Sequence, residues 1–147
     1  MRNWPRLGKR LIFVISQPRS GSTLLQKVLG SHSAIHTLSE PWVALQPLFG
    51  LRETGIAADY SARLAHIGVQ EFLAALPEGE EAYWEAVRLM LGHLYRRALE
   101  ESGKRFFLDK TPRYTMILPE LRHVFPEAHF VFLLRNPLAV LASVIDT

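Results

Sequence analysis

The chain has 147 residues, of which 48% are hydrophobic and 21% are charged. This balance is typical of a globular protein, and the length suits one domain with a sizeable core. The formal net charge of +3 suits an anionic ligand but is too small and diffuse to indicate nucleic-acid binding. The absence of cysteine excludes a disulfide scaffold and thiolate metal sites. The apolar run after the basic N-terminal residues is too short for a signal peptide or a membrane span, so we expect a soluble cytoplasmic protein.

The first recognisable unit is a strand, a loop of small residues and a helix. Residues 11–16 (LIFVIS) predict a buried strand, and Gln17 and Pro18 end it. The segment RSGST (residues 19–23) follows, after which apolar residues recur at helical spacing up to Gly30. A helix that begins directly after such a loop presents backbone N–H groups and the positive end of its dipole. This arrangement forms an anion site, most often for phosphate.

The loop is close to a P-loop but differs from that of a nucleoside triphosphatase. When Gly21 is aligned with the second glycine of G-x-x-x-x-G-K-[ST], Ser16 and Ser22 stand where the first glycine and the lysine would be. The cation has moved to Arg19, while Thr23 keeps a hydroxyl at the start of the helix. The alternative interpretation is an ordinary connecting loop with a solvated arginine.

Turn residues and apolar periodicity divide the rest of the chain into further elements. In chain order we expect a short strand at 35–38, then a short helix and a turn at Gly55 within 42–58, then helices at 59–76 and 80–102. A strand at 104–109 follows, and after it a helix up to 125 that starts late or kinks at Pro119. The last expected elements are a strand at 129–134 and a helix from 138 onward. The helices within 59–102 are predicted to form an insert that borders a substrate cleft. Trp84 and Tyr95 are predicted core residues.

Alternating strands and helices, with near-continuous apolar strands, predict an α/β fold in three layers, a parallel sheet with helices on both faces. Ligands of such sheets bind at the carboxyl ends of the strands. Charged residues follow the predicted strands directly, namely Arg19, Glu40, Lys110 and Arg135. We therefore expect these side chains to meet at one edge. Because the last helix has no cap before Thr147, we also expect a single domain, residues 1–147, that is incomplete at its C-terminus.

Two motifs resemble those of sulfotransferases that use 3′-phosphoadenosine 5′-phosphosulfate (PAPS). QPRSGSTLL (17–25) is similar to their 5′-phosphosulfate loop, and FVFLLRNPLAVLAS (130–143) is similar to their 3′-phosphate-binding segment. Between them, SEP at 39–41 and DKTP at 109–112 look like elements of the tyrosylprotein and bacterial branch of this family. The resemblance covers residues 10–46 and 104–147, and it implies a P-loop-like α/β fold.

The resemblance implies sulfuryl transfer from PAPS to a hydroxyl or amine acceptor, without a metal. For the donor it implies that the backbone N–H groups of Ser20, Gly21, Ser22 and Thr23 bind the 5′-phosphate and that Arg19 binds the phosphosulfate. Arg135 and Ser143 would bind the 3′-phosphate. Lys110 would lie at the sulfuryl group or bridge oxygen, and Glu40 would act as general base. Arg113 is a lesser candidate for a contact to the donor or acceptor.

Several alternatives stay open at this point. His32 and His36 are rival candidates for the base, because other branches of the family use histidine. Two other function classes are a non-catalytic module that binds a nucleotide or phosphate, and a P-loop kinase, which the missing Walker lysine disfavours. The acceptor is open among protein tyrosines, carbohydrates and small hydroxylated molecules. No nucleic-acid partner and no membrane span are expected, and the oligomeric state stays open.

Overall fold

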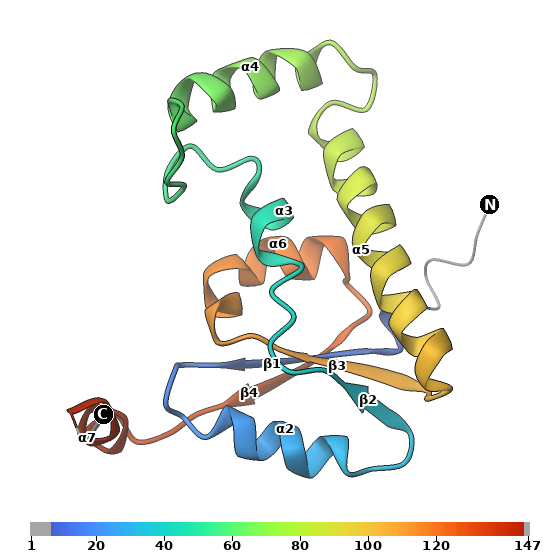
Figure 1. Ribbon diagram of the computed structural model, residues 1–147. Helices are drawn as coiled ribbons and strands as arrows, with labels where there is room; N and C mark the ends of the chain where they lie inside the picture. Colours follow the sequence, from blue (N-terminus) through green and yellow to red (C-terminus); the bar gives the residue numbers. More distant parts are fainter. Residues whose placement is uncertain (1–6, 146–147) are drawn as a thin grey trace.

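The computed structural model describes residues 7–145 and contains a four-stranded parallel sheet (Figure 1). In spatial order the strands are β2 (Ile35–Thr37), β3 (Phe106–Lys110), β1 (Leu11–Ser16) and β4 (His129–Leu133). All neighbouring strands in this sheet are parallel, so their carboxyl ends lie at the same edge. The loop that follows β1 therefore opens at the edge where β3 and β4 also end.

Helices cover both faces of the sheet (Figure 1). α2 (Ser22–Gly30) lies on one face. α5 (Glu80–Ser102), the 3-10 helix η1 (Pro112–Ile117) and α6 (Leu118–Val124) lie on the other. The predicted α/β class with three layers is therefore confirmed.

The core on the α5 side is built around Phe13 of β1, whose side chain is fully buried. Its ring lies 5.6–6.3 Å, between centroids, from the rings of Tyr95, Tyr114, Phe125 and Phe130. Aromatic pairs at this spacing add to the free energy gained from burying their area. Tyr95 is a core residue, as predicted from the helical spacing.

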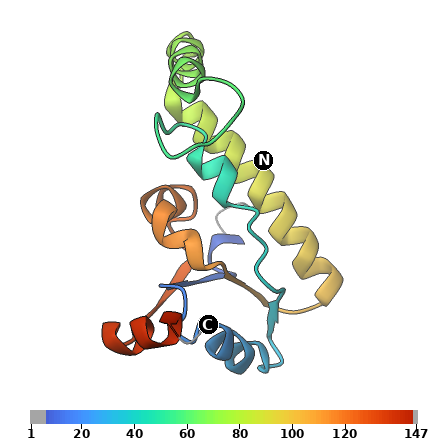
Figure 2. The same ribbon diagram turned by 60° about the vertical axis from the view of Figure 1, so that its left-hand side comes forward.

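The segment between β2 and β3 contains two helices with different environments. α5 buries one side against the core along most of its length, including the predicted core residue Trp84. α4 (Ala62–Ala74) stands away from the sheet in both Figure 1 and Figure 2. Of its residues only Leu73 is buried, whereas Leu64 and Phe72 are 69% and 66% exposed. The short helix expected within 42–58 is α3 (Leu45–Phe49).

The chain around Lys110 and Pro119 differs in detail from its sequence-based description. The third strand was expected at 104–109, but β3 runs from Phe106 to Lys110, so Lys110 is a strand residue rather than a loop residue. The helix expected to start late or kink at Pro119 is divided into η1 and α6. Pro119 lies in the first turn of α6, where no intrahelical N–H bond is lost.

The edge formed by β4 and α7 (Pro137–Ile145) is more exposed than its apolar sequence predicts. Phe132 is 56% exposed, Leu134 is 90% exposed, and no residue described in α7 is buried. The reason is topological, because β4 has β1 on one side and no described strand on the other. Within residues 7–145, no helix is both long and apolar enough to cross a bilayer.

Candidate active site

The loop after β1 has the backbone geometry of an anion-binding turn. Gly21 has φ 89° and is the N-cap of α2, with no side-chain hydrogen bond capping the helix. The first turn of α2 contains no acidic residue, so neither a cap nor a carboxylate competes for the helix N-terminus. Arg19 also adopts a positive φ, 67°, which is uncommon outside glycine. The backbone here is thus shaped to aim N–H groups at one point, as in phosphate sites.

A surface cavity of about 430 Å³ opens at this loop. Its lining consists of Pro18, Arg19, Gly21, Ser22, Thr23, Glu40, Pro112, Arg135 and Ser143. Of the site residues that the family resemblance implies, all are in this lining except Ser20 and Lys110, apart from the lesser candidate Arg113. The structure therefore brings together residues from four separate parts of the chain at the carboxyl edge of the sheet.

Two arginines and a serine from opposite ends of the chain are in direct contact at the cavity. Arg19 Nε donates to Ser143 Oγ over 3.2 Å, and Arg135 Nη1 donates to the backbone carbonyl of Arg19 over 2.9 Å. Guanidinium groups suit phosphate and sulfate because their donors form a planar fork. The cavity thus holds two always-charged cations beside the N-terminus of α2.

Lys110 and Glu40 form an ion pair beside the cavity. Lys110 Nζ lies 2.5 Å from Glu40 Oε1 and 3.4 Å from Thr23 Oγ1. The Lys110 side chain is only 2% exposed, whereas that of Glu40 is 32% exposed. A lysine this buried needs an anionic partner, which Glu40 provides. Lys110 is therefore a buried charge rather than a solvated loop lysine.

Ser20 lies outside this cavity and lines a neighbouring one of about 640 Å³. That second cavity shares Arg135 with the first, and most of its other lining residues are apolar, including side chains of β4 and α7. The two cavities therefore differ in chemistry, one polar and cationic, the other apolar.

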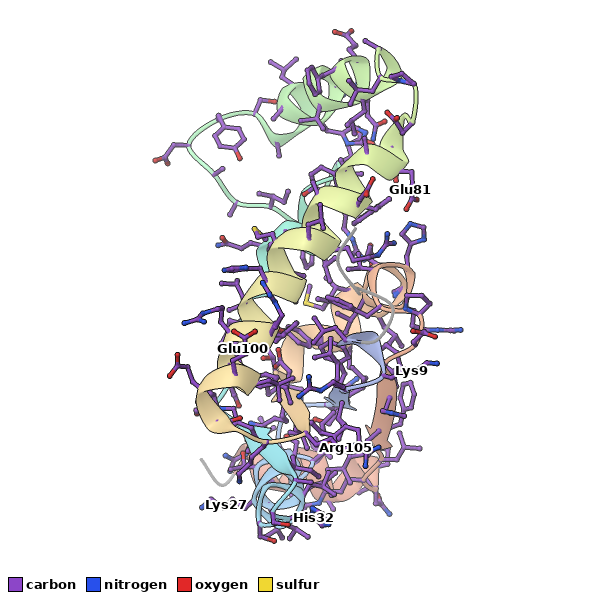
Figure 3. All side chains as sticks on the ribbon, turned by 90° about the vertical axis from the view of Figure 1, so that its right-hand side faces the viewer. Lys9, Lys27, His32, Glu81, Glu100 and Arg105 are labelled. Carbon is purple, nitrogen blue, oxygen red and sulfur yellow. The ribbon has the colours of Figure 1, made fainter. Side chains whose placement is uncertain are left out.

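The rival candidates lie elsewhere. His32 follows the C-terminus of α2, at the far end of the helix from the loop, and Figure 3 shows it there near Lys27. Its Nδ1 accepts from the N–H of Ala34 over 3.1 Å, so it closes a turn. The ring of His36 packs edge-on against Phe107, with centroids 5.6 Å apart. Neither histidine lines the cavity that contains Glu40, and neither does the exposed Arg113.

No group of three His, Cys, Asp or Glu side chains that could hold a metal ion occurs in the part of the chain that the structure describes. The described cations at the cavity are Arg19 and Arg135, with Lys110 beside it.

Sequence reasoning missed a buried polar cluster directly behind the site. The carboxylate of Asp109 accepts from the hydroxyls of Tyr95 (2.7 Å), Tyr114 (3.0 Å) and Thr111 (3.1 Å). Burial raises the pKa of the Asp109 carboxyl to about 6, while these hydroxyls and Lys110 act in the opposite direction. The available sequence signal was an acidic residue inside an apolar strand, which is expensive unless it is hydrogen-bonded.

The parallel sheet, the loop after its central strand and the cationic cavity at a helix N-terminus are those of a P-loop-type α/β protein. The sequence provides the finer assignment, because residues 11–147 match the sulfotransferase family. The chain belongs to this family.

Individual relatives agree with the family. Nodulation protein NoeE of Sinorhizobium fredii is 36% identical over 138 residues, which cover 93% of this chain and 31% of NoeE. A Caenorhabditis briggsae protein with the provisional name protein-tyrosine sulfotransferase is 25% identical, over 94% of this chain and 44% of that protein. Among solved structures, the sulfotransferase domain from the curacin biosynthetic pathway matches with a TM-score of 0.52 and 26% identity. That match covers 92% of this chain and 50% of the curacin domain, so the chain spans half or less of each relative.

Proposed function

We propose that this chain carries the donor site of a sulfotransferase, which transfers a sulfuryl group from PAPS to a hydroxyl or amine. Family membership over residues 11–147 supports sulfuryl transfer in general. The observation that carries the proposal is the convergence of Arg19, Arg135, Ser143 and Glu40 on one cavity at the N-terminus of α2. Such a cavity has two groups of donors for anions, one at the N-terminus of α2 with Arg19 and one at Arg135 and Ser143. A bisphosphate nucleotide needs two such anion sites.

The donor binds at two positions in this proposal. The 5′-phosphosulfate lies on the backbone N–H groups of 20–23 at the start of α2, with Arg19 beside it. The 3′-phosphate lies on Arg135 and Ser143. Support comes from the contact between Arg19 and Ser143, since this contact brings the two anion sites next to each other.

The transfer step needs charge stabilisation more than covalent help, by analogy with phosphoryl transfer. The acceptor oxygen or nitrogen forms a bond to sulfur while the bond from sulfur to the phosphate bridge oxygen breaks. Arg19 and Lys110 stabilise the negative charge that builds on the bridge oxygen of the leaving adenosine 3′,5′-bisphosphate. Glu40 takes the proton of the acceptor. These protein cations supply the charge that Mg²⁺ supplies in P-loop kinases.

Glu40 fits the role of base because it is partly exposed and lines the cavity. The acceptor is a hydroxyl or amine compound in this proposal, and the provisional name of the Caenorhabditis briggsae relative supports tyrosine as one candidate. The proposal treats residues 1–147 as one domain, with 59–102 as a helical insert. The position of α4 away from the sheet supports that division.

Calorimetric titration with adenosine 3′,5′-bisphosphate and with ATP, both in EDTA, tests the donor site. We expect the bisphosphate to bind more tightly than ATP. Arg135→Ala should weaken binding about tenfold or more, because it removes a charge-assisted bond. Arg63→Ala is the matched control, since Arg63 lies on α4 with its side chain 77% exposed. Preference for ATP with Mg²⁺ would favour a kinase, and no binding by the folded chain would overturn the proposal.

A transfer assay with PAPS and a phenolic acceptor then tests the chemistry. Glu40→Gln should lower kcat by about 10²–10⁴-fold, the usual contribution of a general base. A wild-type chain that binds the bisphosphate but transfers nothing would indicate a non-catalytic nucleotide-binding module instead.

A further inference from the structure

Asp109 is a buried carboxylate to which the proposed reaction assigns no role. Its side chain is 1% exposed, and it lines neither of the cavities at the carboxyl edge of the sheet. A group without access to the cavity does not touch the substrate. Any contribution of Asp109 to catalysis must therefore act through its neighbours.

Two hydroxyls that bind Asp109 also hold the segment that follows Glu40. Tyr114 Oη accepts from the N–H of Ala44 over 3.2 Å, and Thr111 Oγ1 accepts from the N–H of Trp42 over 3.4 Å. An ionised carboxylate only accepts hydrogen bonds, so both hydroxyls donate their protons to Asp109. Their lone pairs are then directed to the backbone N–H groups. The charge on Asp109 thus fixes the direction of both bridges.

The segment 42–44 needs such support because its backbone is strained. Trp42 has φ 59°, in the left-handed region that side chains with a Cβ rarely adopt. Strained residues keep their conformation only where surrounding contacts outweigh the strain. The two bridges to Asp109 lie at this point, two and four residues after Glu40.

The residue after Asp109, Lys110, also contacts the Glu40 segment, from the opposite face of β3. Successive strand residues point to opposite faces, so Asp109 points towards α5 and η1 while Lys110 points towards α2. Lys110 holds the carboxylate of Glu40, and Asp109 holds the backbone just after Glu40. The C-terminal end of β3 therefore holds the Glu40 segment at two places, the Glu40 carboxylate and the backbone of 42–44.

We propose that Asp109 is a positioning residue: through Tyr114 and Thr111 it fixes the backbone of 42–44 and so keeps the Glu40 carboxylate at Lys110. This inference rests on the proposed function, because it assigns Asp109 a part in orienting the base of the transfer step. Geometry of this kind controls rate strongly, since a displacement of about 1 Å costs up to about 10²-fold.

A pair of tyrosine variants in the full chain separates positioning from stability. Tyr114→Phe and Tyr95→Phe each remove one hydroxyl that donates to Asp109 Oδ2, but only Tyr114 also binds Ala44. Both variants should lower the urea midpoint. Tyr114→Phe alone should lower kcat by about tenfold or more, with the KM for PAPS within about twofold. Equal losses of kcat in the two variants would overturn the inference.

A double-mutant cycle identifies the residue through which Tyr114 acts. In a Glu40→Gln background, Tyr114→Phe should change kcat by less than about twofold, because a base that is absent cannot be misplaced. Retention of its full tenfold effect in that background would show that Tyr114 acts by another route, and would overturn the inference.

Amide hydrogen exchange gives a readout that does not depend on activity. Tyr114→Phe should speed exchange at the Ala44 N–H about tenfold or more and leave the β1 amides unchanged, whereas Tyr95→Phe should leave Ala44 protected. Unchanged exchange at Ala44 in Tyr114→Phe would overturn the inference that the Tyr114 hydroxyl fixes the backbone at Ala44. A wild-type chain without transfer activity overturns the proposed function instead. The exchange experiment then tests by itself whether Tyr114 fixes the backbone at Ala44.

Discussion

The strands β3 (FFLDK) and β4 (HFVFL) differ sharply in burial, and the more apolar of the two, β4, is the more exposed. β3 lies between β2 and β1, and its residues from Phe107 to Lys110 are all buried. β4 pairs only with β1 among the described strands, and none of its residues is buried. Both pair in parallel with the same strand, so position in the sheet and not composition separates them.

The difference explains where the chain places its polar groups. At the end of β3, Asp109 and Lys110 are buried, and each has specific partners: Tyr95 of α5 for Asp109, and Thr23 of α2 and the loop residue Glu40 for Lys110. At the end of β4, Arg135 is exposed and reaches the cavity from the rim. A buried charge must be satisfied within the protein, whereas an exposed one is free to exchange partners with a ligand. The β3 side therefore supplies fixed geometry, and the β4 side supplies exposed charge.

The largest expected effect tests the contrast in burial between the centre of the sheet and β4. Phe13→Ala removes a fully buried ring and should lower the free energy of unfolding by about 3–5 kcal/mol. Phe132→Ala, the same substitution at a 56% exposed position of β4, should cost less than about 1 kcal/mol. Urea unfolding of both variants measures the difference. Equal losses would mean that β4 is covered in solution.

A second, smaller effect concerns the pKa of Asp109, which is raised to about 6. The folded state then holds a proton that the unfolded chain, with a pKa near 3.9, releases first. Stability due to this group is therefore present below about pH 4 and falls as the pH rises through about 6, by about 2–3 kcal/mol in total. The hydroxyls of Tyr95, Tyr114 and Thr111 and the charge of Lys110 act to lower the pKa of Asp109 and so offset part of the effect of burial.

Asp109→Asn isolates this contribution. Urea unfolding of wild type and variant at several pH values between 4 and 7.5 gives their difference in stability. That difference should shift in favour of the variant as the pH rises, because asparagine has no charge to bury. A difference that is independent of pH would contradict the raised pKa.

The smallest expected effect on stability lies at the end of β4. Leu134 is 90% exposed, so Leu134→Lys should change the free energy of unfolding by no more than about 0.5 kcal/mol. Because the same change places a charge on an apolar edge, it should reduce self-association in sedimentation experiments at high concentration. Leu108→Lys, at a fully buried position of β3, is the opposing control and should prevent folding.

Much of the fold could be predicted from the sequence because local signals were strong. α5 has the predicted bounds, Glu80–Ser102, since Gly79 and Gly103 bracket a long periodic pattern. The meeting of Arg19, Glu40 and Arg135 followed from the rule that parallel strands end at one edge. These predictions needed only periodicity and topology.

Other features depend on where side chains point in three dimensions, which periodicity does not give. The sequence placed Asp109 beside Lys110 but could not show that Tyr114 would link it to Ala44, because Tyr114 and Ala44 are 70 residues apart along the chain. The burial of Lys110 was missed because the strand end was set one residue too early. The exposure of α7 was missed because an apolar helix sequence does not say whether a neighbour covers it.

The contacts of Arg19 with Ser143 and of Arg135 with Arg19 span 124 and 116 residues of chain. Closing loops of that length costs conformational entropy, and contacts of high sequence separation are associated with slow folding. The cavity therefore cannot be a local property of the RSGST loop, and a peptide that contains the loop and α2 alone would lack half of the cavity's cations. A local opening that releases only β4 and α7 would take away Arg135 and Ser143 while β1, β3 and their buried polar cluster stay folded. In the proposed function, ligand affinity is consequently coupled to the opening free energy of β4 and α7, rather than to global unfolding.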